Sequence, residues 1–150
     1  MATTLNHTHA LLTLPFNHHT DFTELADNCE RFMDALVGCE IPAEKIALYG
    51  RLAACLALLQ PTLLEPIPDA LKKSLTVEDF PSRLPVFEPE ADRLGRYCQV
   101  LTQQLISGSL TPDAEDVVQD LLSELVSFYA DTLKMPRWLR TDEGVIELLA

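Results

Sequence analysis

The sequence predicts an all-α fold: a single-domain helical bundle of four main helices plus a short C-terminal helix, with a proline-rich ordered crossing at residues 61–89. Three observations predict this fold. Apolar residues recur at helical spacing in long segments, Pro and Gly stand where those segments begin and end, and no segment of useful length alternates like a half-buried strand. The 150 residues suffice for one ordinary domain with its own core.

Residues 1–20 contain no Lys, Arg, Asp or Glu, and we expect an N-terminal arm there, followed by a single helical domain over 21–150. The apolar residues of the arm, Leu11, Leu12, Leu14 and Phe16, are expected to lie against the bundle. The arm has no positively charged start and its apolar run is broken, so it does not resemble a secretory signal, and the predicted localisation is cytoplasmic.

The first helix is predicted over residues 21–37. Thr20 or Asp21 can cap its start, and Gly38 stands where a left-handed residue often ends a helix. The helical period separates an apolar face from an acidic face that contains Glu24, Asp27, Glu30 and Asp34.

The second helix is predicted to begin near Pro42 and to end before Pro61, because proline suits a first helical turn and disrupts an interior. Between Ile46 and Leu59, Arg51 is the only charged residue. A helix that is apolar nearly all round is typically buried, so we expect this helix at the centre of the bundle.

The segment 61–89 holds six of the ten prolines but also many large apolar residues. We therefore expect an ordered crossing with one short helix at about 69–74 and Leu-rich turns that pack on the core. The alternative is a mobile lid over a ligand site.

The third helix is predicted over about 89–107 and ends at Gly108. The fourth is predicted over about 111–135, where Thr111 is the cap, Pro112 takes the first position and Pro136 follows the end. A last short helix is predicted over 141–149, since it also begins with a capping residue and acidic residues.

The net charge of −12 is concentrated in two places. Residues 21–50 hold seven acidic and two basic residues, and residues 111–135 hold six acidic and one basic residue. In both segments the acids form a stripe opposite the apolar face. Such a stripe is either a solvated face that keeps the protein in solution or a negative docking surface for a basic partner.

Trp138 lies in the one locally basic, aromatic stretch, between Arg137 and Arg140. This composition is typical of an interface hot spot and equally of an anchor that closes a bundle. The residues predicted to bind a partner are Asp27, Glu30, Asp34, Asp113, Asp116, Asp120, Glu124, Asp131 and Trp138.

Motifs for catalysis or cofactor binding are not found. HExxH, GxSxG, GxxxxGKS and GxGxxG do not occur, and every histidine (His7, His9, His18 and His19) precedes residue 20. A metal site built from these histidines is a minor alternative. The four cysteines (Cys29, Cys39, Cys55 and Cys98) form no CxxC pair, so we expect them to be reduced and mostly buried, and we predict no cofactor and no enzyme activity.

Short motifs in the second half of the chain resemble those of a family of small bacterial all-helical proteins of unknown function. They are Val77-Glu78-Asp79-Phe80, Val86-Phe87-Glu88-Pro89 and Met135-Pro136-Arg137-Trp138, within residues 76–138. The resemblance implies a bacterial, all-α protein and transfers no known activity and no catalytic residue.

The function predicted from the sequence is a non-enzymatic acidic module that binds another protein with a basic surface, as an inhibitor, an immunity-type protein or an adaptor. Direct nucleic-acid binding and membrane binding are not expected, because phosphates would be repelled and no apolar run is long enough to span a bilayer. One alternative is an inhibitor that mimics nucleic acid, which requires the two acidic stripes to be adjacent. The other is a ligand-binding or enzymatic bundle with its pocket under residues 61–89.

Overall fold

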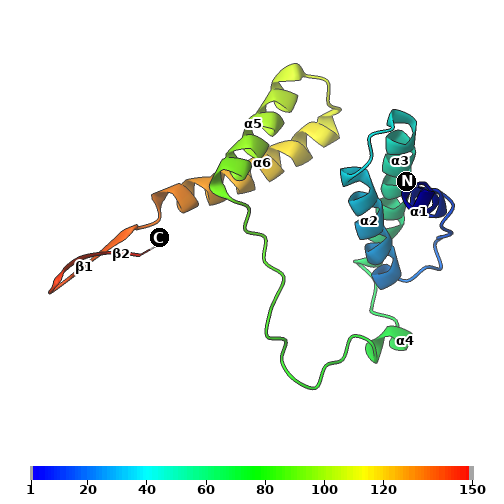
Figure 1. Cartoon of the computed structure of the whole chain (residues 1–150), viewed down its shortest axis with the longest axis horizontal. Coiled ribbons are helices and arrows are strands. Elements are labelled where there is room, and N and C mark those ends of the chain that lie inside the picture. The colour runs from blue at the N-terminus through cyan, green and yellow to red at the C-terminus, as the bar shows by residue number, and fades with distance from the viewer. Residues whose placement is uncertain (1, 149–150) are drawn as a thin grey trace. The chain divides into compact units, whose positions relative to one another are not determined.

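The computed structural model describes the backbone of residues 2–148 and the side chains of residues 7–148. The prediction of a mostly helical chain is confirmed (Figure 1). Within residues 2–148, none of the helices is both long and apolar enough to cross a membrane. In chain order the elements are α1 (Ala2–Leu12), α2 (Phe22–Val37), α3 (Pro42–Thr62), α4 (Asp69–Lys72), α5 (Ala91–Ser107), α6 (Pro112–Lys134), β1 (Trp138–Thr141) and β2 (Gly144–Glu147).

The chain divides into two compact units, Met1–Phe80 and Pro81–Ala150, and each is described by itself. In the first unit α2 packs on α3 and α1 contacts both, and in the second α5 packs on α6. The arm over 1–20 and the single domain over 21–150 are a different division of the chain, and both stay predictions. The four-helix bundle also stays a prediction.

The core of the first unit forms where α1, α2 and α3 meet. Leu12, Leu14 and Phe16 pack against this core, so the expectation that the apolar residues of the arm do so is confirmed. The segment is not extended throughout, however, because residues 2–12 form α1. The buried residues are Leu11, Leu25, Phe32, Leu36, Leu48 and Cys55.

Helix α2 begins as the sequence predicts. The Asp21 carboxylate accepts hydrogen bonds from the backbone N–H groups of Thr23 (2.9 Å) and Glu24 (3.0 Å), two donors that the first turn would otherwise leave unpaired. It also accepts one from the Thr23 hydroxyl at 2.5 Å. The expected left-handed end is wrong, since Gly38 has φ −97° and the N–H of the next residue, Cys39, donates to the Leu36 carbonyl at 3.2 Å.

Two expectations for α3 are wrong. The helix does not stop before Pro61 but runs to Thr62, and i→i+3 bonds from Leu63 N–H to Gln60 O and from Leu64 N–H to Pro61 O (both 3.3 Å) close the turn. It is also not buried all round, because α1 and α2 cover one face and Ile46 is 73% exposed. Its buried residues are Leu48 and Cys55.

The second unit is built on the α5–α6 helical hairpin, with Leu94 and Cys98 buried between the helices. Gly108 ends α5 in the left-handed conformation (φ 64°), and the Thr111 hydroxyl accepts from Ala114 N–H to cap α6. Both boundaries agree with the sequence prediction. Gly95 allows a close approach, since a Cβ there would lie 3.0 Å from the Tyr129 hydroxyl oxygen.

The predicted helix over 141–149 is wrong: residues 138–147 form an antiparallel hairpin in which Trp138 pairs with Glu147 and Leu139 with Ile146. Leu149 lies outside the described residues. Thr141, the expected helix cap, ends β1, and the acidic residues Asp142 and Glu143 form the turn before Gly144, which has φ 134°. Branched and aromatic side chains on both sides of that turn favour strands over a short helix.

The short helix expected in the segment 61–89 is confirmed as α4. The expectation that apolar turns of this segment pack on the core is wrong, because their side chains are exposed. These are Leu63, Leu64, Ile67, Leu75, Val77, Phe80, Leu84, Val86 and Phe87.

Candidate docking surface

The acidic stripe of α2 lies on the face of the helix that points away from the core. Its buried residues are Leu25, Asn28, Phe32 and Leu36, and helical geometry places Asp27, Glu30 and Asp34 on the opposite side, where all three are exposed. The prediction that these acids share a solvent-facing surface is therefore consistent with the geometry of the first unit.

The acidic stripe of α6 is longer. Asp113, Asp116, Asp120, Glu124 and Asp131 are all exposed, and the spacing of three, four, four and seven residues keeps them on one side of the helix. We call these five residues the α6 acidic face. It extends over nearly the whole length of α6 within the second unit.

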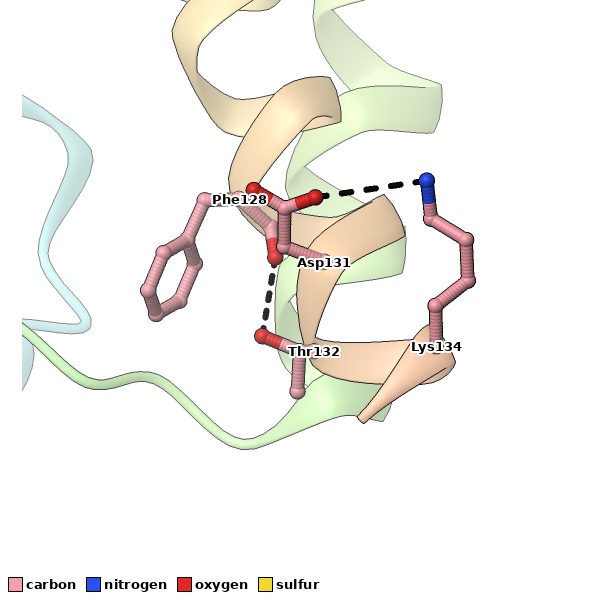
Figure 2. A network of polar contacts seen from close by, with 4 residues as sticks. All are labelled: Phe128, Asp131, Thr132 and Lys134. Atoms are coloured by element: carbon pink, nitrogen blue, oxygen red, sulfur yellow. Dashed lines mark hydrogen bonds and ion pairs between the residues drawn. The ribbon is translucent and has the colours of Figure 1, made fainter. Parts of the chain in front are cut away.

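One member of the α6 acidic face has a basic neighbour (Figure 2). Lys134 Nζ lies 4.0 Å from Asp131 Oδ1, and both side chains are largely exposed. The Thr132 hydroxyl donates to the Phe128 carbonyl at 2.8 Å, and the ring of Phe128 projects to the other side of the helix from Lys134. No other acid–base pair forms among the side chains of residues 7–148. Four acids of the face therefore have no basic side chain beside them.

Trp138 does not join the acidic faces. It is 63% exposed at the start of β1, and within the described part of the chain the hairpin strands contact each other and none of the helices. The stripes of α2 and α6 belong to different units. The structure thus places five of the nine predicted residues on one continuous surface, the α6 acidic face.

Sequence reasoning missed an apolar groove between α5 and α6. Its volume is about 420 Å³, and its lining carries no polar surface. We call it the α5–α6 groove. Its lining residues are Phe87, Tyr97, Val100, Leu101, Leu121 and Leu125.

The signal for the groove was present in the sequence but was interpreted as core. The apolar stripe of α6 is wider than one partner helix can cover, and as a result Leu121 stays 43% exposed and Phe128 40% exposed.

Two further pockets lie among the described residues. One of about 520 Å³ opens beside Gly95, Arg96 and Tyr129 on α5 and α6. Another of about 360 Å³ lies at α4, within the crossing that the ligand-binding alternative invokes. All five of its lining residues are exposed and come from one short stretch of chain, so it lacks the enclosure typical of a ligand site.

The cysteines and histidines are the nucleophilic and metal-ligating groups that the sequence singled out. Burial raises the pKa of the Cys55 thiol to about 11, and a hydrogen bond with Cys29 adds to the increase. The Cys55 Sγ donates to the Leu25 carbonyl at 3.2 Å. The rings of His18 and His19 lie 3.9 Å apart, but the side chains of residues 7–148 include no group of three or more placed to hold a metal ion.

No family model, curated protein or solved structure matches the chain. The family resemblance of residues 76–138 therefore stays a prediction.

Proposed function

We propose that this chain is a non-enzymatic, acidic protein-binding module that docks a basic partner protein through the α6 acidic face. The observation that carries the proposal is the row of five exposed acids along α6, of which only Asp131 has a basic neighbour. Inhibitor, immunity-type and adaptor roles in the cytoplasm all fit such a module. The acids of α2 offer a second contact surface.

The free-energy cost of placing like charges next to one another on α6 supports a functional role for the α6 acidic face. Like charges at i,i+4, as in Asp116–Asp120 and Asp120–Glu124, destabilise a helix by roughly 0.2–0.5 kcal/mol per pair. Nearby Lys or Arg residues would offset that cost, yet α6 contains Lys134 as its only basic residue. A basic surface on a partner would supply the missing charges and would accelerate association by long-range attraction.

The experiment compares two charge-matched variants of the full chain as affinity baits. In the first, Asp116, Asp120 and Glu124 on the α6 acidic face are changed to Lys. In the second, the same number of charges is reversed away from α6 and from the lining of the pockets, at Glu65, Glu78 and Asp79, which are all exposed. Proteins captured by each bait are identified and quantified by mass spectrometry.

The proposal predicts that basic proteins captured by the native chain are lost from the first variant and retained by the second. The proposal is wrong if both variants lose them equally, because net charge alone then explains capture. It is also wrong if the first variant retains them.

A further inference from the structure

The α5–α6 groove is an apolar surface with no neighbour in its own unit. Val100 and Phe87, which line it, are 61% and 69% exposed, and Tyr97 is 40% exposed. When a partner covers apolar surface that is gathered in a groove, water is released from that surface and the complex is stabilised. Apolar residues scattered singly over a surface do not form such a site. The groove is therefore a part of the second unit that is stabilised when a partner covers it.

The groove continues along α6 as a stripe. Val117 is 67% exposed and lies one turn before Leu121, and Phe128 follows seven residues after Leu121 on the same side. From Val117 to Phe128 the stripe is about 17 Å long, or three helical turns. An occupant of matching length is a helix of about 12–15 residues, and a groove between two helices accepts the side-chain ridge of a third.

The α6 acidic face borders this stripe on one side. Asp113 and Asp120 are one turn from Val117, and helical spacing also places Glu124 one turn from Leu121 and Asp131 one turn from Phe128. On α5 the exposed polar residues that helical spacing places on the groove side are Arg93 and Gln104, and the exposed N-cap residue Glu90 lies on the same side. The groove thus has one rim with a row of acids on α6 and a second rim on α5 whose one acid stands at the N-cap, beside a basic residue and an uncharged one.

We propose that the α5–α6 groove binds an amphipathic helix of the partner, whose apolar stripe enters the groove and whose Lys and Arg residues along one flank meet the α6 acidic face. This inference rests on the proposed function and specifies the partner. The charge difference between the rims sets the direction from which the basic flank approaches. The apolar stripe supplies the affinity, and the charges supply rate and orientation.

The test uses the full chain and a designed peptide of about 14 residues, long enough for the groove. The peptide carries Leu at helical spacing, Lys along one flank and Gln elsewhere. Its affinity is measured by fluorescence anisotropy and its helicity by circular dichroism. Two control peptides are used, one with the same composition in scrambled order and one with Glu in place of Lys.

The expected result is that the designed peptide becomes helical on binding and that both controls bind at least about tenfold more weakly. Val100→Asp and Leu121→Asp each weaken the designed peptide by about tenfold or more. Ile46→Asp on α3, a matched change of an exposed apolar residue in the other unit, leaves its affinity unchanged.

The inference is overturned if the scrambled peptide binds as well as the designed one, or if Val100→Asp and Leu121→Asp leave the affinity unchanged. If Asp120→Lys and Glu124→Lys abolish binding while the groove variants do not, the partner docks on charge alone and the proposed function survives without the groove. If the chain alone sediments as a dimer that Val100→Asp dissociates, the groove is occupied by a second copy and the inference is wrong.

Discussion

Arg51 is the one charged residue in the apolar body of α3, and its neighbours explain its presence. Its guanidinium lies 4.3 Å from the ring centroid of Phe16 and 5.7 Å from that of Phe32, and it donates a hydrogen bond to the Leu14 carbonyl. Cation–π contacts of this kind stabilise partly buried arginines. Through these contacts the Arg51 side chain stabilises the packing of the segment between α1 and α2 against α3. The sequence could not predict this, because the acceptor is a backbone carbonyl 37 residues away.

Asp21 is the residue whose role depends most simply on pH. Hydrogen bonds from the Thr23 hydroxyl and from backbone N–H groups favour its ionised form and lower its pKa below the usual value of 3.8. The pKa is lowered by folding, so the contribution of the charge to stability is present above the unfolded pKa and is lost as the pH falls through the folded pKa.

We expect Asp21→Ala to reduce the free energy of unfolding by about 1 kcal/mol at neutral pH. Asp21→Asn keeps a capping side chain and should cost less, and its difference from the native chain should begin to shrink near pH 4 and disappear only as the pH falls through the lowered pKa of Asp21. Urea denaturation followed by circular dichroism measures both. Asp34→Ala, at an exposed position in the middle of α2, is the control. The assignment of Asp21 as the cap is wrong if both alanine variants cost the same.

At the scale of elements, what could be predicted depended on local signals. The starts of α2 and α6 follow from a capping side chain a few residues from the donors it satisfies, and the boundaries agree with the prediction. The hairpin could not be predicted in this way, because Thr141, Asp142 and Glu143 suit a helix start as well as a turn. The extent to which α3 is buried also could not be predicted, since burial depends on how many other helices cover α3 and not on the composition of α3.

The glycines that follow α2 and α5 provide a matched test at this scale. Gly108 has φ 64°, a conformation that side chains with a Cβ disfavour, whereas Gly38 has φ −97° and open space around the position of a Cβ. We expect Gly108→Ala to reduce the free energy of unfolding by about 1 kcal/mol.

Gly38→Ala should be neutral or slightly stabilising, because it lowers the entropy of the unfolded chain without strain. Thermal unfolding of the two variants measures both effects. Equal effects in the two variants would contradict the described ends of α2 and α5.

At the scale of the whole molecule, the sequence predicts where the acidic residues lie on α6 but does not predict the apolar groove beside them. Helical period alone predicts that the acids of α6 share a face, and they are exposed as expected. The α5–α6 groove could not be predicted, since an apolar residue that lines an open groove and one that lies in a core follow the same period. Trp138 was predicted from composition, and the structure places it in a hairpin that contacts no described helix.

The most direct measurement for the α6 acidic face is the association rate of the chain with its captured basic partner as a function of salt. We expect the rate to fall by about tenfold or more between roughly 0.05 and 0.5 M ionic strength, because screening shortens the reach of the acids. Changing Asp116, Asp120 and Glu124 to Lys should remove this dependence, and changing Glu65, Glu78 and Asp79 to Lys should preserve most of it. A rate that does not vary with salt in the native chain would contradict the account.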